Sequence, residues 1–404
     1  MPIWPLLAML GVQTLATMAV FALPAAAPEV VRDLGVDRGM VGLFVSMIYG
    51  VSIISAMFSP GFIHRYGPIR VSQVVLLATA AMLAITAAGT LLSLALGALA
   101  IGVGYGATAP AATHLLVPQT PKRVFNLVMS VRQIGVPLGG VLGALIVPPL
   151  TLAYGWRAAM AAQILPALIL AALLQIPRRR WDAGRNPRHL ILGRGLLGPL
   201  RLLRQDPALQ KLSLASFVYS GIQLCFIAFM TVHLTSDVGF DLLAAGRALA
   251  AYQFAGAISR PIWGWIADRY IAPARVLALH GVVMAGACVA TGLFNPRWTM
   301  LEVIATCLIA GATASGFTGI AYAEYARLGG PRRTEATGLG AAAMFTGIML
   351  IPLKHGGHVD RHRQPAVVLW GAGVARGLRR FSDWRPSGCL DGPSIDGSDG
   401  TNGT

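Results

Sequence analysis

One arginine inside an apolar stretch is the residue of this chain best placed to do chemistry. Arg132 lies within the apolar run 125–149, next to Gln133. An arginine inside a bilayer costs about 2.5 kcal/mol or more, so it usually faces a cavity or a partner. We therefore predict that Arg132 contacts a solute. The alternative is that its side chain extends to the membrane surface, where Arg123 lies nine residues earlier.

Other polar side chains within apolar runs are candidates to line the same path. Taken singly, each is more often an interhelical hydrogen bond than a ligand contact. Besides Gln133, they are Gln13, Tyr49, Tyr105, Gln223, Tyr252, Gln253 and Tyr322.

The placement of the acidic residues indicates the charge of the solute. The chain has 16 Asp and Glu residues, and we expect none in the middle of an apolar run, with Glu302 and Glu324 flanking one. A buried cation without a buried anion favours an anionic solute, organic or inorganic. We find no Ser/His/Asp set, no metal-ligand spacing, no CxxC pair and no phosphate-binding loop, so we predict neither an enzyme, a metal site nor a cofactor.

The elements that carry these residues are long apolar runs. The chain is 55% hydrophobic and 12% charged, with a mean hydropathy of +0.65. A span needs about 20 apolar residues, and eleven runs qualify or nearly qualify. They predict an all-α, polytopic membrane protein: 3–23, 39–59, 71–89, 92–117, 125–149, 157–176, 212–233, 243–266, 274–294, 299–323 and 336–353.

The basic residues predict the orientation. A net charge of +16 could suggest nucleic acid, but the charges lie in loops between apolar runs. Eighteen Lys and Arg residues fall on one side and four on the other (Arg32, Arg38, Arg157 and Arg297). By the positive-inside rule we expect a multi-pass protein of the plasma (inner) membrane with a cytoplasmic N-terminus, surrounded by lipid and not bound to nucleic acid.

A repeated basic loop divides the chain into two related halves. Residues 60–70 (PGFIHRYGPIR) and 264–275 (GWIADRYIAPAR) each join two apolar runs. We predict a six-helix bundle over 1–176, a basic cytoplasmic linker over 177–211, and a bundle of five helices over 212–353. Two halves around a central path are typical of membrane transporters.

These loops resemble the signature G-x-x-x-D-R-x-G-x-x-R of the major facilitator superfamily. Arg65, Gly67 and Arg70 match, while His64 stands where Asp is usual and Pro60 where Gly is usual. The second copy carries Gly264, Asp268, Arg269 and Arg275. The resemblance covers residues 1 to about 353. It implies two helical bundles and a secondary active transporter of a small solute that works by alternating access, with a co-transported proton or counter-ion left open, and a monomer.

The motifs also suggest mechanical roles. Gly264 would let its helix approach a neighbour, and Arg269 and Arg275 would pair with Asp268 or with helix-end carbonyls to bias a two-state equilibrium. The alternative is that these arginines only anchor the membrane topology. Gly135, Gly139 and Gly143 recur every four residues and form one smooth helix face. With Pro137 and Gly140 they are similar to the helix-5 motif of the family's antiporters; tight packing alone is the other interpretation.

The C-terminal 51 residues, 354–404, do not continue the pattern. They are rich in Arg, Gly, Pro, His and Ser. Two halves of six helices each would need a twelfth membrane helix in this segment. We expect a disordered tail of the kind that a shifted reading frame would produce. The alternatives to a working transporter are therefore a non-functional truncated product, or a membrane receptor or scaffold that does not transport.

Overall fold

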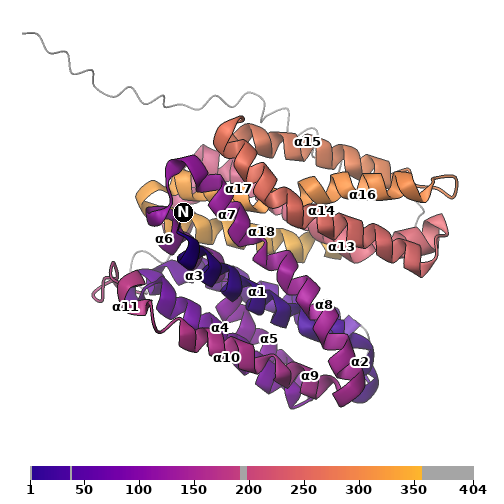
Figure 1. Ribbon diagram of the computed structural model, residues 1–404, viewed down its shortest axis with the longest axis horizontal. Helices are drawn as coiled ribbons and strands as arrows, with labels where there is room; N and C mark the ends of the chain where they lie inside the picture. Colours follow the sequence, from indigo (N-terminus) through magenta and orange to yellow (C-terminus); the bar gives the residue numbers. More distant parts are fainter. Residues whose placement is uncertain (1, 37–38, 192–197, 357–404) are drawn as a thin grey trace, which may run out of the picture.

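The computed structural model of the chain describes residues 2–36, 39–191 and 198–356, and these residues form helices and no strands. The all-α prediction is confirmed (Figure 1). The tail beyond residue 356 lies outside the described residues, as does 192–197 of the linker. The helix that ends the described part continues to Gly356, so residues 354–356 are helical, contrary to the expected boundary at residue 353.

The first bundle follows the first six apolar runs. Three of the runs are single helices and three are helix pairs. They are α1 (Ile3–Ala25), α3 (Gly39–Tyr66), α4 (Pro68–Ala87), α5 (Leu91–Tyr105) with α6 (Thr108–Leu116), α7 (Phe125–Gln133) with α8 (Gly135–Tyr154), and α9 (Trp156–Ala162) with α10 (Ile164–Leu173). The short α2 (Ala27–Leu34) follows α1.

The second bundle follows the other five runs. Its helices are α13 (Pro207–His233), α14 (Leu242–Arg269), α15 (Pro273–Gly292), α16 (Met300–Ala314), α17 (Thr318–Gly329) and α18 (Arg333–Gly356). The linker between the bundles contains α11 (Arg178–Trp181) and α12 (Gly198–Gln205). Short turns join other helices: η1 (Val117–Gln119), η2 (Lys122–Val124), η3 (Leu234–Val238) and η4 (Gly330–Arg332).

Within the described residues, nine segments are long and apolar enough to cross a membrane. One of them, Met300–Ile351, contains two of the eleven runs, and α14 is not among the nine. Helix α14 carries polar residues within its length, among them Gln253 and Arg260.

Glycine determines how closely some helices approach. Gly106 lies at the break between α5 and α6, and a Cβ there would come within 2.3 Å of the Ser52 carbonyl oxygen on α3. Any side chain at this position would force the two helices apart.

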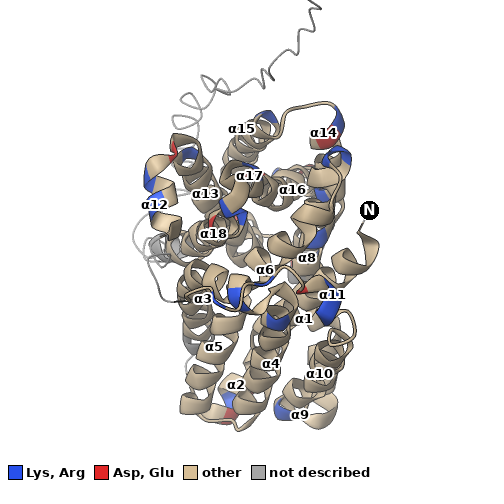
Figure 2. Cartoon of the chain, turned by 90° about the vertical axis from the view of Figure 1, so that its left-hand side faces the viewer, with Lys and Arg blue, Asp and Glu red and all other residues tan. Residues whose placement is uncertain are grey.

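The two bundles lie closest at one end of the molecule. In Figure 1 the ribbons meet near α6, α7, α17 and α18 and diverge towards α2 and the start of α16. Helices α3 and α18, and α7 and α14, pack against each other across this contact. We call this end the basic end, because it carries residues 65–70, 117–124, 178–191, 269–275 and 327–333. Figure 2 looks onto it and shows Lys and Arg on α12 and around α3 and α11.

Candidate functional site

Arg132 is fully buried between the bundles. It lies in the last turn of α7, just before the break at Ile134 that separates α7 from α8. Its exposure is 1%, so the side chain does not reach the membrane surface and the alternative interpretation is wrong. A desolvated guanidinium needs acceptors around it.

The neighbours of Arg132 are neutral groups. Its Nη1 donates to Gln13 Oε1 at 3.4 Å, and its Nη2 donates to Gln133 Oε1. Its Cζ lies 5.4 Å from the ring centroid of Tyr322, which belongs to the second bundle. In the part of the chain that the structure describes, Nε is buried and has no acceptor. The site therefore has unused donor capacity.

A second buried arginine, Arg260 of α14, approaches from the other bundle. It is 1% exposed. Its Nε and Nη2 donate to the carbonyl oxygen and the hydroxyl of Ser315, each at 3.0 Å, and its Nη1 donates to the carbonyl of Gln133. The two arginines thus share Gln133 as a neighbour. Among the described residues neither forms an ion pair with a carboxylate.

The sequence analysis missed Arg260, although the signal was present. Arg260 lies inside the apolar run 243–266, so the cost of a buried charge applied to it as much as to Arg132. Ser315 was also missed, and no single-residue signal marks it.

Most of the other candidates surround these arginines. Gln13 donates to Thr17 Oγ1 at 3.1 Å, and Thr17 contacts the hydroxyl of Tyr105 at 3.2 Å. Gln223 donates to the hydroxyl of Ser315 at 3.2 Å. A polar chain therefore extends from each arginine into its own bundle.

The remaining two polar candidates lie on α14. Tyr252 reaches the carbonyl of Gln223 at 3.5 Å and stacks on Phe226, with ring centroids 5.4 Å apart. Gln253, the next residue, is half-buried, and no contact places it beside either arginine.

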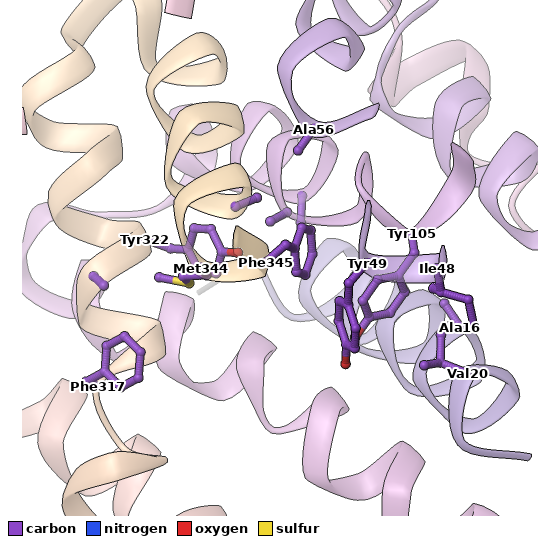
Figure 3. Packing of buried hydrophobic residues seen from close by; sticks show 14 of the residues in the cluster. Ala16, Val20, Ile48, Tyr49, Ala56, Tyr105, Phe317, Tyr322, Met344 and Phe345 are labelled. Carbon is purple, nitrogen blue, oxygen red and sulfur yellow. The ribbon is translucent and has the colours of Figure 1, made fainter. Parts of the chain in front are cut away.

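Aromatic rings join the bundles beside the polar groups. Tyr49 and Tyr105 lie edge to face at 6.3 Å, and Phe345 of α18 is 5.6 Å from each of them. Figure 3 shows Phe345 between these two tyrosines and Tyr322. The site therefore combines positively charged hydrogen-bond donors with the flat apolar faces of aromatic rings.

The first basic loop is held by the linker. Gly67 has a φ of 94°, and Asp182 accepts hydrogen bonds from the backbone N–H groups of Ile69 (2.8 Å) and Arg70 (3.2 Å) at the start of α4. Burial raises the pKa of Asp182, while these two N–H groups act in the opposite direction. Arg70 also donates to Gln73 at 3.0 Å, and the Arg65 guanidinium lies over the ring of Tyr66.

The second basic loop joins the two bundles. Asp268 accepts hydrogen bonds of 2.9 Å from the backbone N–H groups of Asn126 and Leu127 at the start of α7. The Asp268 carboxylate does not pair with Arg269 or Arg275 as expected, because both arginines are exposed. At Gly264 the two helices approach closely, because a Cβ there would lie 2.7 Å from the Ser130 hydroxyl of α7.

A family model for the Major Facilitator Superfamily matches residues 9–352. The chain belongs to this superfamily. It is 27% identical over 328 residues to a 4-hydroxybenzoate transporter, PcaK, of Acinetobacter baylyi, which covers 72% of this chain and 70% of the relative. It is 25% identical over 343 residues to the chloramphenicol efflux pump Rv0191 of Mycobacterium tuberculosis, covering 82% and 77%.

Solved structures agree on the fold. The fucose:proton symporter FucP of E. coli superimposes with a TM-score of 0.70 at 15% identity, over 94% of this chain and 98% of that one. Major facilitator proteins of this kind are transporters, and the expectations of a membrane transporter and of no enzyme are confirmed.

The glycines that resemble the family's helix-5 motif lie on α8 and pack inside the first bundle. A Cβ at Gly139 would lie 2.4 Å from the Thr14 carbonyl oxygen of α1, and one at Gly135 would lie 2.9 Å from Leu10. Gly143 faces Met18 of α1 in the same row, whereas Gly140 points to Phe21. Pro137 is buried in the first turn of α8. These contacts favour tight packing of α8 on α1.

One acidic residue differs from expectation. Glu324 does not flank its helix, because α17 continues to Gly329 and buries the carboxylate to 4% exposure. Arg327 pairs with it from the same helix, donating from Nε at 3.0 Å. Arg327 therefore balances the negative charge of Glu324, which does not neutralise the two buried arginines.

Proposed function

We propose that this major facilitator protein transports a small organic anion by alternating access. The observation that carries the proposal is the pair Arg132 and Arg260, buried from opposite bundles with no carboxylate partner among the described residues. Buried cations without an anion are costly, and a bound carboxylate would compensate them.

The rings around the site support an aromatic carboxylate. A guanidinium presents two parallel donors that fit a carboxylate. Tyr49, Tyr105, Tyr322 and Phe345 offer apolar surface for a ring next to it. The relative that transports 4-hydroxybenzoate is consistent with this class.

An anion between the arginines would also link binding to movement. Arg132 belongs to the first bundle and Arg260 to the second, so a ligand that contacts both stabilises arrangements in which the bundles are close. From the charge distribution we expect the N-terminus and the basic end to lie on the cytoplasmic side of the inner membrane. We expect the protein to be a monomer in lipid.

The test is uptake of 4-hydroxybenzoate into proteoliposomes that contain the full chain. Arg132→Gln and Arg260→Gln should each reduce uptake at least about tenfold, the effect of losing 1.4 kcal/mol of binding. Arg132→Lys should recover little, because an ammonium cannot make the two parallel bonds. The matched control is Arg123→Gln, an exposed arginine at the start of the same membrane segment, which should transport normally.

Ligand binding provides a second measurement, which does not depend on whether transport is coupled to a proton or a counter-ion. Saturating 4-hydroxybenzoate should raise the thermal unfolding temperature of the wild type but not of either glutamine variant. Uptake by Arg132→Gln and Arg260→Gln at the wild-type rate would refute the site. Stabilisation by neutral chloramphenicol and not by any carboxylate would refute the anion class.

A further inference from the structure

Three histidines meet at the basic end of the contact between the bundles. His64 lies in the last turn of α3, His114 belongs to α6, and His189 comes from the linker. The ring centroid of His64 lies 5.0 Å from that of His114 and 5.1 Å from that of His189. The backbone N–H of Asn186 donates to the His64 carbonyl at 2.8 Å, which holds the linker against α3.

The second bundle places a carboxylate opposite His64. Glu335 lies in the first turn of α18, with its Oε1 3.5 Å from His64 Nε2. Its Oε2 is buried and, within the described residues, has no hydrogen-bond partner. The neighbouring Thr334 contacts His114 Nδ1 through its hydroxyl at 2.8 Å. Two side chains in the first turn of α18 therefore contact imidazole groups, one on α3 and one on α6.

The charges around the cluster favour one bound proton. Glu335 is the carboxylate that faces His64, while Arg332 and Arg333 act on Glu335 and His114 from the start of α18. A single protonated histidine is balanced by Glu335, and a second would be repelled by the first and by the arginines. In the described part of the chain no set of three His, Cys, Asp or Glu side chains has the arrangement of a metal site.

We propose that His64 and Glu335 form a proton-binding site that closes the basic end. With the proton bound, the imidazolium of His64 attracts the Glu335 carboxylate and holds α18 against α3. Without it, the imidazole is neutral, Glu335 keeps a charge with no cationic partner on α3, and the closed arrangement is less favourable.

The exchange of acidic and basic partners relative to the usual loop motif makes the contact between His64 and Glu335 sensitive to pH. The loop motif usually has Asp where this chain has His64, and the carboxylate now comes from the opposite bundle. Histidine is the side chain that changes charge between about pH 5 and 8. Because the attraction between a charged His64 and Glu335 exists only when α18 lies against α3, closure is favoured at acidic pH and is lost as pH rises through the usual histidine range.

Proton access fits the geometry. The side chains of His64 and Glu335 are 26% and 21% exposed. They are shielded enough for the charge to be incompletely screened, and open enough to exchange protons with the solvent at the basic end. The proposal is independent of the solute, because neither residue contacts Arg132 or Arg260 in the hydrogen bonds described above.

The experiment measures the opening of the basic end directly. Spin labels are placed at Gln119→Cys, next to α6, and at Tyr270→Cys, at the end of α14, both exposed and on different bundles. The full chain is reconstituted in lipid nanodiscs after its native cysteines are replaced with serine. Distances between the labels are recorded by double electron–electron resonance at about pH 5.5 and about pH 8, on either side of histidine titration.

The wild type should show mainly the short distance at the acidic pH, and a several-fold larger long-distance population at the alkaline pH. His64→Gln and Glu335→Gln should each abolish this pH response. His64→Arg, which is permanently charged, should keep the short distance at both pH values.

The matched control is His233→Gln. His233 also contacts a carboxylate, Asp237, at 2.8 Å, but that pair joins residues four apart in one bundle and cannot hold two bundles together. This variant should respond to pH as the wild type does. A pH response that persists in His64→Gln, one that disappears in His233→Gln, or a wild type that does not respond at all would each overturn the proposal.

Discussion

The Asp268 carboxylate of the second bundle caps a helix of the first. It accepts hydrogen bonds from the backbone N–H and the side-chain Nδ2 of Asn126, both at 2.9 Å, and a third from the Leu127 N–H. Helix N-termini carry unsatisfied N–H groups and partial positive charge, so a carboxylate is stabilising there. Because α7 and α14 belong to different bundles, this cap exists only while the basic end is closed.

Removing the charge of this cap should favour the open arrangement. We expect Asp268→Asn, which keeps an oxygen acceptor but loses the charge, to increase the open population about fivefold, the effect of losing about 1 kcal/mol of interaction with the helix N-terminus. The distance between labels at Gln119→Cys and Tyr270→Cys measures it. Arg269→Gln, one residue further along, is the control and should leave the distance unchanged; equal opening of the two variants would mean that disturbance of the loop, not loss of the cap, is responsible.

A side chain at Gly319 should prevent closure. A Cβ there would lie 2.3 Å from the Ser130 Cα of α7, and backbone at that distance cannot yield without moving the bundle. We expect Gly319→Val to be trapped open at the basic end and to lose transport while still inserting into membranes. Gly246→Val, where no atom lies within 4 Å, should behave as the wild type. Normal cycling of Gly319→Val would contradict the close contact.

The far end of the first bundle should be weakened by acid. A hydrogen bond from Trp156 Nε1 (3.0 Å), followed by one from Arg157 (2.6 Å), lowers the pKa of Asp33. Since the folded protein binds this proton less tightly than the unfolded chain, the stabilisation is present above the ordinary aspartate pKa and is lost as pH falls through the lowered one.

Thermal unfolding followed at neutral pH and at about pH 3, below the usual aspartate range, tests this expectation. Asp33→Asn should lower the unfolding temperature at neutral pH and have a smaller effect in acid. An equal decrease at both pH values would show that the Asp33 charge does not matter.

The orientation that we propose can be tested by labelling. Single cysteines at Arg185→Cys, in the linker, and Asp237→Cys, after α13, lie at exposed positions in opposite loops. An impermeant thiol reagent added to intact cells should label position 237 and not position 185. Labelling of position 185 from outside would overturn the cytoplasmic basic end.

Some features of this protein follow from its sequence alone. The number and length of the apolar runs determined the helices, because a bilayer crossing requires about 20 apolar residues whatever the neighbours are. The repeated loops indicated two halves. Arg132 was found by the same logic, since a charge inside an apolar run is costly in any fold.

The tertiary structure decided which of these residues meet. Arg260 joins Arg132 through Gln133, 127 positions away in sequence, and Glu335 meets His64 only because α18 packs on α3. Asp268 had arginines close by in sequence but bonds to α7 instead, because three N–H donors converge on it there. Periodicity and hydropathy describe each helix against lipid, whereas these contacts depend on how two bundles face each other, which no local pattern contains.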